Sequence, residues 1–233
     1  MKVALVALLC YLIGCINPAF IIGKAKGFDI RKQGSFNAGA SNVVINVGKK
    51  AGVITALLDI FKSFFCVKLC GWIFPGMPTV VVFCSVFCVI GHIFPVFLKF
   101  KGGKGFASLG GLVLGFNPLV FIIMLASAFL IVLVIQYLCL ITTLTCLSFP
   151  IIYLVMTHDY IGAVILFLLG LIIISKHIPN FKRIKEGTEA RFSGMWNREK
   201  EEARIRENLA KLGRDETEVF GEKSFESQKK TNR

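Results

Sequence analysis

The feature that most constrains this chain is a long stretch, between Lys104 and Lys176, that contains no Lys or Arg. Apolar residues dominate the stretch, and a membrane-spanning helix needs about 20 of them in a row. A soluble domain of 233 residues could bury an ordinary core without so many apolar runs. Because 55% of the whole chain is hydrophobic, we expect most of it to lie within a membrane.

The acidic residues are concentrated at one end of the chain. Before Ser175 the sequence has only these: Asp29, Asp59 and Asp159. After Ser175 residues of both signs are dense. This division predicts one membrane domain followed by a short charged appendage.

The apolar runs predict an all-α, polytopic membrane helix bundle with about seven transmembrane helices. Their approximate bounds are 3–22, 51–72, 79–98, 106–117, 118–137, 139–157 and 160–175. The fourth run is short and glycine-rich, so it also fits a half-span or a broken helix. Irregular backbone at membrane depth is tolerated only against protein or a watery cavity, which would suit a site beside Gly110 and Gly111.

The first apolar run, from Val3 to Ile22, has the length of a secretory signal peptide. Gly14, Asn17 and Pro18 interrupt its apolar core, and no clean small-residue cleavage site follows. We therefore expect the run to be retained as the first spanning helix.

Basic residues between the apolar runs predict the orientation of the chain. In the first and third loops they are Lys24, Lys26, Arg31, Lys32, Lys49, Lys50, Lys99, Lys101 and Lys104. The loops at 73–78 and 157–160 carry no Lys or Arg. The positive-inside tendency then places the N-terminus outside and the C-terminus in the cytoplasm. Seven crossings satisfy that assignment, whereas six or eight do not.

The formal net charge of +13 does not by itself indicate a nucleic-acid partner. Basic residues of the membrane domain lie between apolar runs, where the positive-inside tendency puts them, and they also attract anionic lipid headgroups or phosphate-bearing substrates. All eight cysteines lie in apolar runs and none forms a CxxC pair. We expect small buried side chains there rather than a metal site.

Three polar motifs fall on the predicted cytoplasmic side, and the first is GSFNAGASN at residues 34–42. Its small residues let backbone N–H groups approach a ligand closely, and its Ser and Asn side chains add donors and acceptors. Such a loop before a helix suits a phosphate group. An ordinary turn with a helix cap has the same composition, so that alternative stays open.

The second motif combines GHIFP at residues 91–95 with FKGGKG at residues 100–105. Lys101 and Lys104 flank a double glycine, which frees the backbone to surround an anion while the lysines supply charge. A Walker A loop is excluded, because GxxxxGK[ST] is absent. The alternative is a basic turn that only sets topology, which needs fewer glycines. As a lone histidine, His92 is expected to be a hydrogen-bonded structural group.

The third motif is KHIPNFKR at residues 176–183, with Glu189 shortly after it. His177 and Asn180 are three residues apart, so they share a helical face if the turn persists through Pro179. The alternative is a basic anchor whose side chains reach the membrane surface.

Asp59 and Lys62 lie inside the second predicted span, three residues apart. Ionisable groups at such depth are expensive, and they usually face an interior and pair. A structural ion pair and a wall of an active site are both open interpretations.

Together these motifs resemble the bacterial acyl-phosphate:glycerol-3-phosphate acyltransferase family, known as PlsY, over roughly residues 3–191. The strongest piece is GHIFPVFLKFKGGKGFASLGG at residues 91–111, which is similar to the second motif of that family. Residues 176–189 look like its third motif and residues 34–42 like its first. The intramembrane acid–lysine pair resembles a short element of the same family.

The resemblance implies a seven-helix, multi-pass enzyme in the plasma membrane of a bacterium, with its active site facing the cytoplasm and membrane lipids around it. It implies transfer of an acyl chain from acyl-phosphate to the 1-hydroxyl of glycerol 3-phosphate. Lysophosphatidic acid and inorganic phosphate would leave. No metal, cofactor or thioester donor would take part.

By position within the motifs, the resemblance implies a set of site residues. Those expected at the reacting centre are Ser35, Lys104, His177 and Asn180. Those expected to bind substrate are Asn37, Asn42, Lys101, Gly102, Gly103, Thr142, Thr143, Arg183 and Glu189. Possible supporting residues are Asp59, Lys62 and His92. Either His177 or the phosphate of the substrate would take the hydroxyl proton.

Two positions depart from the pattern of the family. Its first motif reads GSGN, whereas Phe36 replaces the second glycine here. The family has an arginine shortly after that motif, where this chain has Ile45, and isoleucine cannot grip a phosphate as arginine does. These departures leave open a divergent paralogue with an altered acceptor or low activity. A small-anion transporter is the alternative from another class, suggested by the short fourth run and the intramembrane pair.

The tail contains a stretch with helical periodicity and a thin apolar stripe, at residues 197–212. A solvated helix is the simpler interpretation, and a helix on the membrane surface or against a partner is the other. From Gly213 onward the composition predicts disorder. We therefore expect a membrane acyltransferase domain over 1–191 and a charged cytoplasmic tail over 192–233.

Overall fold

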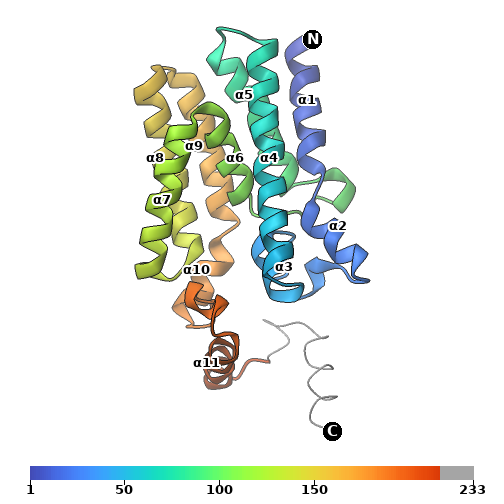
Figure 1. Cartoon of the computed structure of the whole chain (residues 1–233), viewed down its shortest axis with the longest axis vertical. Coiled ribbons are helices and arrows are strands. Elements are labelled where there is room, and N and C mark those ends of the chain that lie inside the picture. Colours follow the sequence, from blue (N-terminus) through green and yellow to red (C-terminus); the bar gives the residue numbers. More distant parts are fainter. Residues whose placement is uncertain (216–233) are drawn as a thin grey trace.

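The computed structural model describes residues 1–215, and within that range the protein consists of helices with no β-strand (Figure 1). The α-helices are α1 Lys2–Cys15, α2 Pro18–Ala25, α3 Ala40–Asn46, α4 Lys49–Ile73, α5 Pro78–Ile93, α6 Phe106–Phe116, α7 Pro118–Ile135, α8 Leu138–Thr157, α9 Tyr160–Ser175, α10 Ile178–Lys185 and α11 Arg198–Lys211. Short 3₁₀ helices are η1 Ile30–Lys32, η2 Val96–Leu98 and η3 Phe192–Met195. The all-α prediction is confirmed for this range. The disorder expected after Gly213 lies almost wholly outside it.

Polar side chains set where several helices begin. Asn117 accepts hydrogen bonds from the backbone N–H groups of Leu119 at 2.9 Å and Val120 at 3.1 Å, and so caps α7. Asn17 caps α2 in the same way, with a proline in the first helical turn. The run expected as one helix over 3–22 is therefore broken into α1 and α2.

Small residues set the closest contacts between the long helices. The helix α1 packs along α5, and α4 packs along α6. A Cβ atom added to Gly14 or Gly91 would overlap the backbone of the facing helix in the first pair, and one added to Gly111 would overlap the backbone of α4. Close backbone approach of this kind is how helices associate where lipid removes the hydrophobic driving force. The eight cysteines are all buried and free, as the sequence predicts.

The outer surface of the bundle is apolar, as expected of a protein that lies in lipid. Along α7 only Val132 is buried, and large side chains such as Leu119, Ile122 and Leu130 are exposed by 60% or more. A contiguous exposed apolar surface of this extent is typical of a membrane interaction.

Within residues 1–215, four helical segments are long and apolar enough to cross a membrane: Lys2–Ala25, Pro78–Leu98, Pro118–Ile135 and Leu138–Thr157. A fifth is added if α9 and α10, which meet at a bend of 46°, count as one span. The helix α4 is longer but contains Asp59, Lys62 and Lys68, and α6 is short. Helices cover all seven predicted runs, whereas the number of crossings stays a prediction.

The polar motifs gather at one end of the bundle. The start of α1 lies at the upper end in Figure 1, and α2, α3 and α10 lie at the lower end, with α11 beyond α10. The second polar motif reaches the same end, because its loop contacts both the first and the third motif, as described below.

Candidate active site

One buried side chain, Asn42, holds the first polar loop in shape. Its Nδ2 group donates toward the carbonyl oxygens of Ile30 at 2.8 Å, Gln33 at 2.9 Å and Asn37 at 2.9 Å. Its Oδ1 atom accepts from the backbone N–H of Ser35 at 2.9 Å. The amide of Asn42, which the sequence predicts to bind substrate, is therefore occupied in shaping the loop that carries Ser35 and Asn37.

The first loop contacts the glycine loop of the second motif, which we define as residues 99–105. A Cβ atom added to Gly103 would lie 2.9 Å from the carbonyl oxygen of Ala38 and would overlap the imidazole of His92. Arg31 donates from Nη1 to the carbonyl oxygen of Leu98 at 2.9 Å. Two motifs that are far apart in the sequence thus meet.

The double glycine is pinned to the end of α5. The N–H of Gly102 donates to the carbonyl of Ile93 at 3.1 Å, and the N–H of Gly103 donates to the carbonyl of His92 at 3.0 Å. Both N–H groups are therefore engaged within the protein, and the binding of a phosphate by this loop stays a prediction. The glycines also serve close approach, since a Cβ atom at Gly102 would overlap the carbonyl oxygen of His92.

Lys104 leads from the glycine loop to the third motif. Its Nζ atom donates to Oδ1 of Asn180 at 2.6 Å. Nδ2 of Asn180 donates to one carboxylate oxygen of Glu189 at 2.6 Å, and the other oxygen accepts from Nε of Arg183 at 2.6 Å. We call these four predicted residues, Lys104, Asn180, Arg183 and Glu189, the Lys104 cluster.

The partners of Asn180 dictate its orientation. The ammonium of Lys104 can only donate and the carboxylate of Glu189 can only accept, so the amide oxygen faces the lysine and the NH₂ group faces the glutamate. Burial lowers the pKa of Lys104 to about 8, the positive Arg183 adds to that shift, and the negative Glu189 opposes it. The charge on Lys104 therefore depends on its neighbours near neutral pH.

His177 lies just before α10 and is buried. Its Nδ1 atom is 2.9 Å from the carbonyl oxygen of Ile173. Since a carbonyl only accepts, Nδ1 carries the proton, and Nε2 of the neutral ring is left as an acceptor. The helical turn continues through Pro179, the condition on which the sequence predicts that His177 and Asn180 share a face.

A second group of charged side chains lies behind the glycine loop, and we call Asp59, Lys62 and His92 the Asp59 cluster. Nζ of Lys62 is 2.7 Å from Oδ1 of Asp59 and 3.0 Å from Nδ1 of His92. It also donates to the carbonyls of Gly14 at 3.1 Å and Ile16 at 2.8 Å. These carbonyls end α1, where a helix leaves them without partners. The cluster therefore joins the break in the first apolar run to the glycine loop.

Among the predicted residues that belong to neither cluster are Lys101, Thr142 and Thr143. Lys101 is exposed. The hydroxyls of Thr142 and Thr143 each donate to a backbone carbonyl one turn back in α8, at 3.0 Å. The neighbouring Cys139 interacts electrostatically with the Lys104 cluster, so the start of α8 lies beside it.

Asn17 has a role at the site that sequence reasoning missed. Its Nδ2 group donates to the carbonyl of Ala38 at 3.0 Å, while its Oδ1 atom accepts from the N–H of Phe20 at 2.8 Å. The side chain thus caps α2 and holds the first loop against the broken helix. An amide within an apolar run is the signal that points to it.

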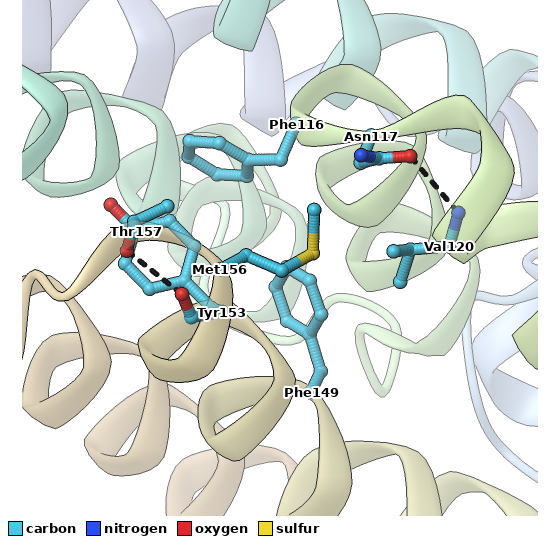
Figure 2. Close-up of a pocket in the computed structure, with 7 residues that line it drawn as sticks. All are labelled: Phe116, Asn117, Val120, Phe149, Tyr153, Met156 and Thr157. Carbon is cyan, nitrogen blue, oxygen red and sulfur yellow. Dashed lines mark hydrogen bonds between the residues drawn. The ribbon is translucent and has the colours of Figure 1, made fainter.

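A separate pocket lies at the other end of the bundle. Figure 2 shows it between the α6–α7 turn and the end of α8, lined by Phe116, Asn117, Val120, Phe149, Tyr153, Met156 and Thr157. None of these seven lining residues is charged, and none is a predicted site residue. The candidate active site is therefore the group of loops around the Lys104 cluster, and not this aromatic pocket.

Residues 4–187 match a protein-family model described as glycerol-3-phosphate acyltransferase. The glycerol-3-phosphate acyltransferase of Bacillus subtilis (strain 168) is 39% identical over 193 residues, which are 81% of this chain and 97% of the relative. The protein of that name from Finegoldia magna is 39% identical over 189 residues, covering 80% of this chain and 94% of the relative.

Two solved structures are similar as well. One is the crystal structure of PlsY (YgiH), described as an integral membrane glycerol 3-phosphate acyltransferase, in its glycerol 3-phosphate form. It matches with a TM-score of 0.78 and 32% identity, over 84% of this chain and 98% of that chain. The other is the lysophosphatidic acid form of the same enzyme, which matches with a TM-score of 0.72 and 32% identity, over 82% and 96%.

Proposed function

This chain belongs to the glycerol-3-phosphate acyltransferase family, and on that premise we propose that it is an integral membrane enzyme that acylates glycerol 3-phosphate. The acyl group comes from acyl-phosphate and goes to the 1-hydroxyl of the acceptor. A bond forms between the hydroxyl oxygen and the acyl carbon, and the bond from that carbon to the phosphate oxygen breaks. Lysophosphatidic acid and inorganic phosphate leave. The two forms of the solved relative, named for glycerol 3-phosphate and lysophosphatidic acid, support this acceptor and product.

The observation that carries the proposal is the contact between Lys104 and Asn180, which joins two motifs 76 positions apart. Within residues 1–215, Asn180 supplies the hydrogen-bond acceptor of the Lys104 ammonium. An ammonium has three donors, so most of its capacity is left for a ligand. A partly buried cation with unused donors is suited to a phosphate.

The reaction requires little covalent chemistry from the protein itself. Acyl-phosphate is a mixed anhydride and is already activated, so the protein mainly positions the acceptor hydroxyl and stabilises developing charge. Lys104 and Arg183 supply positive charge at the cluster. Nε2 of His177 is an acceptor for the hydroxyl proton, and the phosphate of the substrate is the other candidate base.

We assign the remaining predicted residues by their positions. Ser35 joins Lys104, His177 and Asn180 at the reacting centre. The side chains that bind or orient substrate are Asn37, Lys101, Thr142, Thr143, Arg183 and Glu189. Asn42, Gly102 and Gly103 contribute to substrate binding by shaping their loops, since the Asn42 side chain and the two glycine N–H groups are engaged there. Asp59, Lys62 and His92 support the glycine loop from behind.

We further propose the membrane arrangement in which this site works. Seven crossings place the N-terminus outside and the C-terminus in the cytoplasm of a bacterium, with the active site at the cytoplasmic face of the plasma membrane. Residues 1–191 form the acyltransferase domain, and 192–233 form a cytoplasmic tail. Cysteine labelling of Asn37→Cys, Gly103→Cys and His177→Cys in intact cells tests the arrangement, because accessibility from opposite faces would exclude one shared site.

The activity itself is tested with the purified full-length protein in detergent, supplied with acyl-phosphate and glycerol 3-phosphate. Phosphate release that requires both substrates, with formation of lysophosphatidic acid, is the expected result. Hydrolysis of acyl-phosphate that does not depend on glycerol 3-phosphate would contradict it. Anion flux into vesicles without acyl transfer would favour the transporter.

A second candidate function is that of a divergent paralogue with an altered acceptor or low activity. The observation that favours it is Ile45, on α3, at the position where the family has an arginine. A charged hydrogen bond to phosphate is worth roughly 1.5–3 kcal/mol, so Ile45→Arg should lower the Michaelis constant for glycerol 3-phosphate by about tenfold or more. An unchanged constant would show that this position does not limit the acceptor.

A further inference from the structure

The tail helix α11 is docked onto the turn that follows α10. Ile205 and Leu209, on its inner face, are buried to 3% and 1% exposure. Arg204 donates from Nη1 to the carbonyl of Gly187, and from Nη2 to the carbonyl of Glu189 at 2.8 Å. The helix is therefore packed against the acyltransferase domain over part of its surface, which a freely solvated helix would not be.

Two further contacts hold the same helix in register. Nδ2 of Asn208 donates to the carbonyl of Gly187 at 2.9 Å. Glu201 accepts from Nη2 of Arg204 at 2.6 Å and from the backbone N–H of Arg191 at 2.7 Å. The guanidinium of Arg204 is thus held on one side by Glu201, and it presents its planar fork of donors to the turn.

Glu189 connects this helix to the Lys104 cluster. Its backbone carbonyl is bound by Arg204, while its carboxylate binds Nδ2 of Asn180 and Nε of Arg183, both at 2.6 Å. Asn180 in turn presents its oxygen to Lys104. A shift of the Glu189 backbone would therefore reach the lysine through two hydrogen bonds.

We propose that Arg204 is a positioning residue for the acyl-transfer site, which fixes Glu189 so that its carboxylate holds Asn180 and, through it, Lys104. This inference rests on the proposed function. The family match ends at residue 187, so the helix that carries Arg204 lies outside the matched segment. The chain thus completes its active site with a residue of its own tail.

The pH profile distinguishes positioning from a general structural role. The charged and titratable groups that face Lys104 are Arg183, Glu189, Cys139 and His177. Of these, the Glu189 carboxylate favours the ammonium form of Lys104. If Arg204 holds that carboxylate in place, its loss moves the alkaline limb of kcat/KM to lower pH.

The experiment measures kcat/KM for glycerol 3-phosphate, with saturating acyl-phosphate, in the full-length enzyme. The range from about pH 7 to about pH 10 keeps the acceptor phosphate dianionic, since its second pKa is about 6. Arg204→Ala should lower kcat/KM by about tenfold, the size expected when a charged hydrogen bond is lost. It should also shift the alkaline limb of the pH profile in the same direction as Glu189→Gln. The double variant should show no further shift, and Arg204→Lys should restore part of the rate.

Two matched variants on α11 complete the test. Asn208→Ala removes a contact to Gly187 and leaves the Glu189 contact of Arg204 in place. Lys211→Ala removes an exposed ion pair with Glu207. In both variants the alkaline limb of kcat/KM should stay at its wild-type pH. A limb that is unchanged in Arg204→Ala, or shifted equally in Asn208→Ala, would overturn the inference. An inactive wild-type enzyme would instead refute the proposed function.

Discussion

Two groups of charged side chains flank the glycine loop, and they differ in how completely their donors are used. In the Asp59 cluster, Nζ of Lys62 has Asp59, His92 and two helix-ending carbonyls around it. In the Lys104 cluster, the ammonium hydrogen-bonds to one amide oxygen within residues 1–215. The first lysine has no capacity left for a ligand, whereas the second has most of its capacity left.

We propose that this difference separates a supporting role for Lys62 from a reacting role for Lys104. Lys62 is 8% exposed and Asp59 is 1% exposed, and a buried charge persists only when it is paired and hydrogen-bonded. Arg183 and Glu189 are more exposed, at 24% and 14%. Buried charge is therefore common to both clusters, and our proposal of the site rests on the unused donors of Lys104.

The largest expected effect comes from removing Lys104, the lysine with unused hydrogen-bond donors. Lys104→Ala should lower kcat by about 10³-fold, because loss of one well-placed donor to developing charge costs about 10²–10³-fold and the substrate phosphate also loses its cation. The protein should still fold, since Ala leaves Asn180 with Glu189 as a partner. Phosphate release and thermal unfolding, measured side by side, test both statements. Full activity in this variant would remove Lys104 from the mechanism.

The corresponding change in the Asp59 cluster, where all the donors of the lysine are used, should change the stability of the protein. Lys62→Met leaves the buried Asp59 carboxylate with Nδ1 of His92 at 3.1 Å but without its ammonium partner, and breaking a buried ion pair costs about 3–5 kcal/mol of unfolding free energy. The melting temperature in detergent should fall accordingly. Asp59→Asn combined with Lys62→Met is the control, because removal of both charges is often nearly neutral. A double variant no more stable than Lys62→Met would show that the ion pair does not carry the effect.

Side-chain patterns in the sequence anticipate much of this arrangement. The apolar runs predict where the long helices lie, and the second and third motifs contain the residues of the Lys104 cluster. Both signals can be recognised in the sequence because helix length and side-chain chemistry are local properties. The role of Asn17 is harder to predict, since its amide donates to a carbonyl in a loop that begins well after it in the chain.

Backbone roles could not be predicted in the same way. The glycine loop suggests free amides around an anion, yet both amides bind the end of α5. Which carbonyl an N–H meets depends on tertiary packing, and glycine composition does not encode it. The contact of Arg204 with Glu189 could not be predicted from the sequence either, because an arginine in a charged helix has no local feature that marks such a contact.

A smaller effect, on pH dependence, sharpens the contrast between the lysines. The pKa of Lys104 is lowered to about 8 by burial and by Arg183, against the opposing effect of Glu189. The ammonium form binds phosphate, so kcat/KM for glycerol 3-phosphate should fall as pH rises through about 8. Removing the carboxylate removes the effect that opposes the shift, so Glu189→Gln should move the fall to lower pH. A fall at the same pH in both proteins would separate Glu189 from Lys104.

The smallest effect tests whether stability can change in the first polar loop without a change in the chemistry of the Lys104 cluster. Phe36 has φ of 54° and its side chain is 44% exposed. A left-handed backbone costs an L-residue about 1–2 kcal/mol, and part of any relief is lost to the greater freedom of glycine in the unfolded chain. Phe36→Gly should therefore raise the unfolding free energy by about 0.5–1 kcal/mol and leave kcat/KM unchanged. A lower melting temperature would mean that the exposed ring, through contact with lipid or substrate, contributes more than its backbone costs.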